Sequence, residues 1–101
     1  MVEGQGAFFA NFPKSNDLYC GARIEPFLKE TDLVLLVESR APWYPPSNAP
    51  KGAKIVAIGS NPVKDTMVYQ VTGAEQYLEG DTALTLQLLT AELRRQKLDA
   101  P

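Results

Sequence analysis

The chain has 101 residues, of which 45% are hydrophobic and 22% charged, so it can supply the core of one globular domain. It has no histidine and one cysteine, Cys20, which excludes a Ser-His-Asp triad, a Cys-His pair, imidazole metal ligands, an internal disulfide and a CxxC pair. The net charge of −2 lacks the basic excess that nucleic-acid binding normally needs. No apolar run approaches the ~20 residues that span a bilayer, and the first residues do not resemble a signal peptide. We therefore expect a cytoplasmic protein that binds neither nucleic acid nor membrane.

The first third of the chain shows little regular periodicity. Residues 2–3 fit the stub of a strand, and a long loop follows from residue 4 to residue 19. Loops of that length are uncommon inside compact domains. A helix is expected over residues 22–29, with Pro26 in its first turn or at a kink.

Three segments are predicted to form strands. Residues 33–38 and 54–59 are continuous apolar runs, which are typical of strands buried on both faces of a parallel sheet. Gly59-Ser60-Asn61-Pro62 ends the second run with strong turn residues. Residues 74–79 alternate small or apolar with polar side chains, which favours a half-exposed strand at the sheet edge.

A proline-rich loop and a helix complete the pattern. Residues 40–50 hold four of the eight prolines, so this segment is predicted to be neither helix nor central strand. It follows a parallel strand, at the end of the sheet where ligands bind in open α/β folds. A helix is predicted over residues 81–96, because Asp81 is a good N-cap, leucines recur at helical spacing and basic residues lie in the last turns.

This order of elements predicts an α/β fold with a parallel sheet and flanking helices. Such a fold normally begins with complete strand–helix units. Here the first residues show no such unit, so the chain is expected to start in the middle of the fold. We therefore expect part of a larger domain. A sheet without its remaining strands and helices exposes an edge and an apolar face, so self-association of the isolated chain is expected.

Taken together, these segments resemble a known family. The run 18–21, the short helix, the runs 30–40 and 54–62, and then Tyr77-Leu78-Glu79-Gly80-Asp81 follow one another in a familiar succession. It is similar to the central domain of thiamine diphosphate-dependent enzymes of the acetolactate synthase and benzoylformate decarboxylase group. The similarity extends from about Phe12 to Leu93, and the ordered combination carries it rather than any single motif.

The resemblance implies a fold and a division of the chain. The fold is a six-stranded, parallel, Rossmann-like domain, of which residues 1–101 are the carboxyl-terminal part. Residues 1–20 are its strand stub and long loop, and residues 81–97 the helix that leads out of the domain.

The resemblance also implies a parent enzyme that acts on 2-oxo acids, as a carboligating transferase or a decarboxylating lyase. Its thiamine diphosphate and magnesium are bound by segments that this chain lacks. Gly80-Asp81-Thr82 begins like the family's GDG motif, but Thr82 replaces the second glycine and no matching Asn follows, so we interpret Asp81 as a helix cap. The chain itself is then an inactive scaffold that contacts the remaining domains of its parent, a homodimer or homotetramer.

Some relatives bind FAD or an adenine nucleotide at the carboxyl ends of these strands. Matched residue by residue, Arg40 stands at the family's arginine after the first strand, and Asn61 at the Asp of its "D-P" pair. These two residues are the candidate nucleotide or flavin site. Gly59 stands where a second acid is common and the loop 42–50 departs from the "R-F-D-D-R" run, which weighs against such a ligand and favours a structural Arg40.

The alternative function is a stand-alone, small α/β nucleotide-binding module without catalysis. Other features are interpreted as structural. Gly4-Gln5-Gly6 lacks the helix that a phosphate loop needs, and Cys20 is predicted to be a buried, inert thiol. The acidic residues before the first strand are interpreted as solvated: Glu25, Glu30 and Asp32. The aromatic residues are interpreted as part of a core or of a domain interface: Phe8, Phe9, Phe12, Trp43 and Tyr44.

Overall fold

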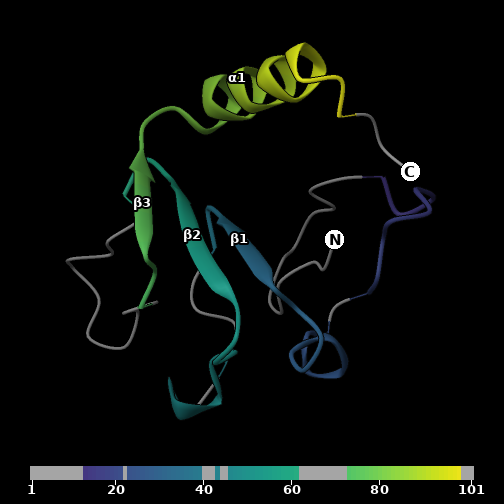
Figure 1. The fold of residues 1–101 in the computed structure, drawn as a ribbon, viewed down its shortest axis with the longest axis vertical. Coiled ribbons are helices and arrows are strands. Elements are labelled where there is room, and N and C mark those ends of the chain that lie inside the picture. The colour runs from purple at the N-terminus through teal and green to yellow at the C-terminus, as the bar shows by residue number, and fades with distance from the viewer. Residues whose placement is uncertain (1–12, 22, 40–42, 44–45, 62–72, 99–101) are drawn as a thin grey trace.

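The computed structural model describes residues 13–21, 23–39, 43, 46–61 and 73–98. In this part of the chain, strands β1 (Leu33–Val37), β2 (Lys54–Gly59) and β3 (Gln76–Glu79) form one parallel sheet in the order β1-β2-β3. The connection from β3 leads into helix α1 (Thr82–Arg95), as Figure 1 shows. These elements form a small α/β fold, which confirms the predicted class. The predicted strand stub at residues 2–3 and most of the loop that follows it lie outside the described residues.

The three strands pair in register, so their carboxyl ends meet at one edge of the sheet. Val37 pairs with Ile58, and Ile58 pairs with Leu78. β3 lies at an edge of this sheet, as predicted for residues 74–79, but all four of its residues are exposed rather than half of them. β2 lies between the other two strands and is buried from Ile55 to Gly59, which confirms the prediction for its apolar run.

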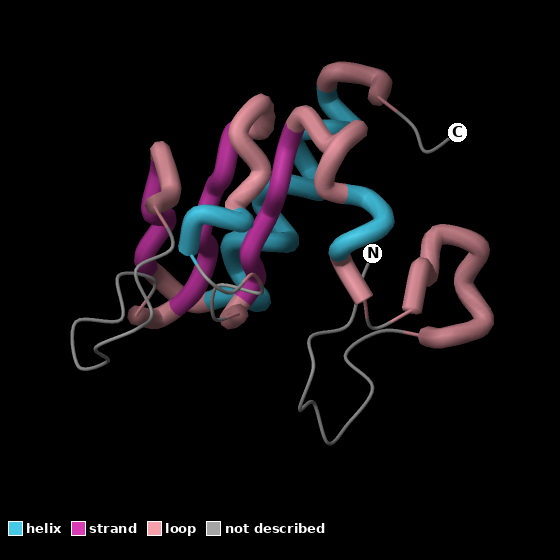
Figure 2. The backbone as a smooth tube through the Cα atoms, turned by 90° about the horizontal axis from the view of Figure 1, so that it is seen from below, coloured by secondary structure: helices cyan, strands magenta, loops and turns pink. Residues whose placement is uncertain are grey.

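A small core covers one face of the sheet. Leu36, Ile55 and Ala57 are at most 6% exposed, and Trp43, from the connection between β1 and β2, packs against them and is 7% exposed. Strand alternation directs the buried side chains of Val56 and Ile58 to the opposite face. On that face α1 contacts β2, behind the strands when the molecule is seen from below (Figure 2).

β1 differs from the prediction of a strand buried on both faces. Leu33, Leu35 and Val37 are 50%, 44% and 38% exposed. These side chains share the face on which α1 lies, but α1 contacts β2 more than β1. The continuous apolar run of β1 therefore includes a face that no described element fully covers.

The predicted helix over residues 22–29 is wrong. Within it, the described residues form a single 3-10 turn, Glu25–Phe27, with Pro26 in the first turn. Proline fits only the first turn of a helix, and β1 begins at Leu33, so too few residues remain for an α-helix. The proline-rich segment predicted to lack helix also contains one 3-10 turn, Pro46–Asn48.

α1 begins as the sequence predicts. Asp81 Oδ1 accepts a hydrogen bond from the Leu84 N–H at 2.8 Å, which confirms Asp81 as the N-cap. The helix ends at Arg95, one residue before the predicted end, with Arg94 and Arg95 in its last turn. Within the described part of the chain, no helix is long and apolar enough to cross a membrane.

Candidate functional site

Three chain segments meet at the carboxyl edge of the sheet. Glu38 follows β1, Ser60 follows β2, and Thr82 opens α1 directly after β3. The backbone holds them together, because the Glu38 N–H donates to the Ile58 carbonyl at 2.8 Å and the Gly80 N–H donates to the Gly59 carbonyl at 2.9 Å. Parallel open sheets bind their ligands at this edge, so it is the first place to look for a site.

The side chain of Glu38 joins the three segments. Its Oε1 accepts hydrogen bonds from the Ser60 N–H at 2.9 Å and from the Thr82 hydroxyl at 2.6 Å. Glu38 holds this position with a φ of 48°, in the left-handed region that non-glycine residues rarely adopt. A non-glycine residue accepts this conformation only where its surroundings fix it, and the two hydrogen bonds do so here.

Gly59 makes room for the Glu38 carboxylate. A Cβ at position 59 would lie 3.0 Å from Glu38 Cδ and 3.1 Å from each carboxylate oxygen. A side chain at this position would press on the carboxylate, which must shift by a few tenths of an ångström. We call Glu38, Gly59, Ser60 and Thr82 the Glu38 cluster.

Among the described residues, carboxylates gather at this edge. Glu79 at the end of β3 and Asp81 at the start of α1 add carboxylates near the Glu38 cluster. A phosphate or diphosphate placed here would be repelled by these charges, and the two donors at the centre already bind Glu38. The described side chains of this edge tie three segments together and do not by themselves form an anion site.

The candidate residues from the sequence are not brought together by the described structure. Arg40 lies outside the described residues, as do Gly4-Gln5-Gly6, Phe8, Phe9, Phe12 and Tyr44. Asn61 is exposed, just beyond the Glu38 cluster. Glu38, Ser60 and Thr82 were not predicted from the sequence to lie together. The available signal was an acidic residue directly after one apolar strand and a glycine at the end of the next.

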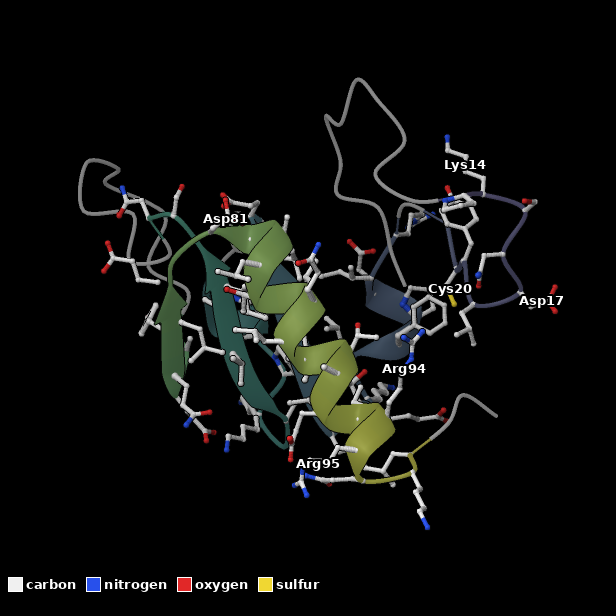
Figure 3. The ribbon with its side chains drawn as sticks, turned by 90° about the horizontal axis from the view of Figure 1, so that it is seen from above. Lys14, Asp17, Cys20, Asp81, Arg94 and Arg95 are labelled. Atoms are coloured by element: carbon white, nitrogen blue, oxygen red, sulfur yellow. The ribbon has the colours of Figure 1, made fainter. Side chains whose placement is uncertain are left out.

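Three other predicted assignments can be compared with the structure. Cys20 is exposed rather than buried, and its thiol donates to the Leu18 carbonyl at 3.4 Å. It lies on the segment 13–21, away from the sheet (Figure 3). Glu25, Glu30 and Asp32 are exposed, as predicted. Trp43 is a core residue, which confirms the interpretation of that aromatic.

The residues that the structure describes do not fit a thiamine diphosphate–magnesium site. The Asp81 carboxylate, which begins the incomplete GDG-like motif, caps α1. No group of three or more His, Cys, Asp or Glu side chains among the described residues could hold a metal ion. No cofactor chemistry is therefore assigned to these residues.

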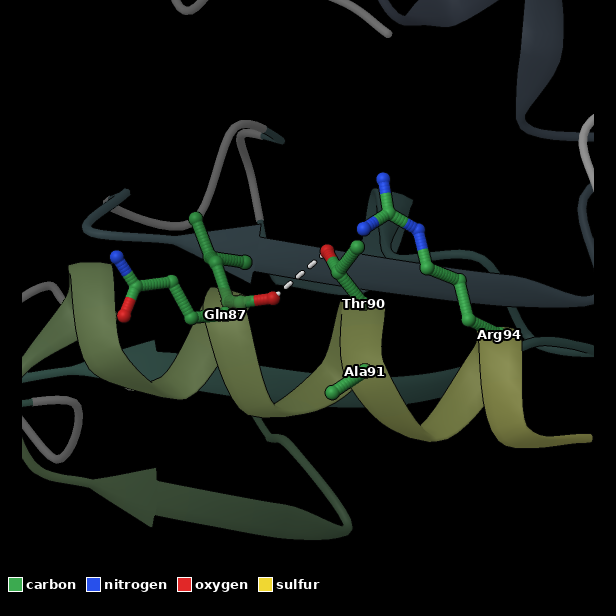
Figure 4. Close-up of a pocket in the computed structure, with 5 residues that line it drawn as sticks. Gln87, Thr90, Ala91 and Arg94 are labelled. Carbon is green, nitrogen blue, oxygen red and sulfur yellow. Dashed lines mark hydrogen bonds between the residues drawn. The ribbon is translucent and has the colours of Figure 1, made fainter.

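α1 carries a shallow depression of about 400 Å³, lined by Leu86, Gln87, Thr90, Ala91 and Arg94 (Figure 4). The Thr90 hydroxyl donates to the Leu86 carbonyl at 2.9 Å, so the helix backbone satisfies it. The lining contains one cation and no acid or thiol that could serve as a base or nucleophile. The depression is a surface feature of the helix rather than a catalytic pocket.

The last turn of α1 holds an ion pair that makes helix stability depend on pH. Hydrogen bonds from Arg95, and secondarily from Gln96, lower the pKa of Glu92 from 4.5 to about 2. A carboxyl whose pKa is lower in the folded state stabilises that state above its unfolded pKa and loses the effect as the pH falls through the folded value. We expect helix content to fall between about pH 4.5 and 2, more in the wild type than in Glu92→Gln.

Far-UV circular dichroism of both proteins across this pH range measures the difference. The difference should be small, because the side chains of Arg95 and Glu92 are 70% and 48% exposed and solvent screens the pair. Identical titrations of the two proteins would contradict the assignment.

Comparison with known proteins found no family model, curated protein or solved structure that matches the chain.

Proposed function

We propose that this chain is a non-catalytic scaffold within a larger, six-stranded, Rossmann-like domain of a thiamine diphosphate-dependent enzyme. The parent enzyme would act on 2-oxo acids, as an acetolactate synthase-like transferase or a decarboxylating lyase. The order of segments along the sequence supports the cofactor class, and the parallel sheet is compatible with the fold. In this proposal the chemistry belongs to thiamine diphosphate and magnesium held by other segments of the parent, and this chain is inactive alone.

The observation that carries the scaffold role is the Glu38 cluster. Ser60 and Thr82 supply the donors that a bound ligand would use at the carboxyl edge, and the Glu38 carboxylate accepts from both. A site for ligands is expected to leave such donors accessible and to carry a charge that attracts the ligand. Here the edge serves to fix β1, β2 and α1 to one another.

Exposed apolar surface supports a contact role. Leu33, Leu35 and Val37 on β1 are 38–50% exposed on one face of the sheet, and Leu88 on α1 is 63% exposed. Exposed apolar side chains that gather on one element, as on β1, are typical of interfaces with other polypeptide. Remaining domains and subunits of the parent would cover it.

The proposed function is tested on the full reading frame that contains this sequence. The encoded protein should consume pyruvate, 2-oxobutyrate or benzoylformate only when thiamine diphosphate and Mg²⁺ are both present. The 101-residue chain alone should consume none of them under the same conditions. A full-length protein that consumes none of these 2-oxo acids, or a reading frame without segments that bind thiamine diphosphate, would overturn the proposed enzyme class.

A further inference from the structure

α1 makes little apolar contact with the sheet. None of its residues is buried, and its least exposed leucines, Leu86, Leu89 and Leu93, are still 37–40% exposed. A surface helix normally turns its apolar stripe into the core of its domain. Segments with few buried apolar contacts open locally at a lower free energy than the whole domain unfolds. Apolar packing alone therefore holds α1 weakly to the sheet.

Within the described part of the chain, one hydrogen bond joins α1 to another segment. The Thr82 hydroxyl donates to Glu38 Oε1 at 2.6 Å. The other hydrogen bonds and ion pairs that α1 forms among the described residues lie within the helix or at its two ends. Separating α1 from the sheet therefore breaks a single polar contact between them.

The face of the sheet beneath α1 is apolar. Val56 and Ile58 are 7% and 3% exposed on the face of β2 that α1 contacts. In the parallel register they stand beside Leu35 and Val37 of β1, which are already 44% and 38% exposed. Figure 3 shows α1 lying across the strands on this side. If α1 moved away, these four side chains would form one exposed apolar face.

We propose that α1 is a hinged cover of this face, which rotates away from the sheet about Gly80 and is kept closed by the hydrogen bond between Thr82 and Glu38. Gly80 is the one residue between β3 and the N-cap Asp81. Its N–H donates to the Gly59 carbonyl at 2.9 Å, which fixes the hinge to the end of β2. A glycine accepts a wide range of backbone angles, as a hinge requires. The inference goes beyond the scaffold role, because it gives the chain a closed state and an open state with different apolar surfaces.

The two partners of this hydrogen bond belong to parts that move relative to each other. Glu38 stays with the sheet, because its Oε1 also accepts from the Ser60 N–H at 2.9 Å and its own N–H donates to the Ile58 carbonyl at 2.8 Å. Thr82 is the first residue of α1 and moves with the helix. Removing the Thr82 hydroxyl therefore releases α1 and leaves the bond between Glu38 and Ser60 in place.

Thiol labelling of the 101-residue chain measures the opening. In a Cys20→Ser background, Val56→Cys places a thiol beneath α1, and Ala57→Cys places one on the opposite face, in the core around Trp43. The thiol at position 56 should react at least about tenfold faster, because opening α1 costs less free energy than unfolding the core. Urea unfolding checks that the two variants have the same global stability. Equal labelling rates in variants of equal stability would overturn the proposal.

Thr82→Val, added to the Val56→Cys chain, tests the role of the hydrogen bond. It removes the hydroxyl and keeps the size of the side chain, so labelling at position 56 should accelerate at least about fivefold. Thr90→Val is the matched control, because the Thr90 hydroxyl donates to the Leu86 carbonyl within the helix. Unchanged labelling with Thr82→Val, or an equal acceleration with Thr90→Val, would overturn the proposal. None of these measurements depends on thiamine diphosphate, so failure of the hinged cover is distinct from failure of the proposed enzyme class.

Discussion

Replacing Trp43 with alanine should lower the free energy of unfolding by about 3–5 kcal/mol, the largest effect expected of any single substitution in the described core. Trp43 is 7% exposed and packs against Leu36, Ile55 and Ala57. It is the one aromatic member of that small buried cluster. Truncation leaves a cavity that the sheet cannot close, because its strands are fixed by their ladder of hydrogen bonds. A domain of this size has a total stability of only about 5–15 kcal/mol, so much of the chain should unfold.

Urea unfolding followed by far-UV circular dichroism measures this loss without relying on tryptophan fluorescence. Trp43→Phe keeps an aromatic ring and should lose less. Leu18→Ala serves as the matched control, since Leu18 is 52% exposed and its truncation should cost less than about 1 kcal/mol. A cost for Trp43→Ala no larger than that of the control would contradict the role of Trp43 in the core.

Replacing Glu38 with alanine should lower the free energy of unfolding by about 1–3 kcal/mol, because two hydrogen bonds to a charged acceptor are lost. The Ser60 N–H and the Thr82 hydroxyl lose their bonds to Glu38, and the ends of β1 and β2 lose their tie to α1. Glu38→Gln keeps an oxygen acceptor without the charge, so it should cost less. A Glu38→Ala protein as stable as the wild type would show that solvent replaces the carboxylate at no cost.

Gly59→Ala should also lower the free energy of unfolding, because it disturbs the Glu38 carboxylate. The new methyl group would lie 3.0 Å from Glu38 Cδ, so the carboxylate must shift, which strains its hydrogen bonds with Ser60 and Thr82. In a Glu38→Ala background there is no carboxylate to displace, and Gly59→Ala should cost little. The two substitutions should therefore be non-additive by at least about 0.5 kcal/mol in a double-mutant cycle. Strict additivity would contradict the close approach of Gly59 and Glu38.

The local elements were largely predictable from the sequence. The apolar runs at 33–38 and 54–59 became β1 and β2, and Asp81 with the leucine spacing located α1 to within a residue at each end. These signals are local, because turn residues and caps act on adjacent backbone. The helix predicted over 22–29 failed for a local reason as well: Pro26 and the nearby start of β1 leave room for one 3-10 turn.

The Glu38 cluster could not be predicted by the same means. Glu38 lies 22 residues from Ser60 and 44 from Thr82, and only the pairing register brings them together. The exposure of Leu33, Leu35 and Cys20 likewise depends on which elements cover them, and composition carries no such information. Residue matching to a family directed attention to Arg40 and Asn61, whereas the hydrogen bonds at this edge centre on Glu38.

The central claim is that the carboxyl edge of the sheet holds β1, β2 and α1 together and is not a ligand-binding site. Calorimetric titration of the chain with ADP, FAD and NAD tests it. Because Glu38 already accepts from Ser60 and Thr82, we predict no saturable heat with any of the three. Glu38→Ala, examined in parallel, removes the carboxylate that repels phosphate and shows whether any binding occurs at this edge. Saturable binding to the wild type that Glu38→Ala alters would contradict the account and favour a nucleotide-binding module.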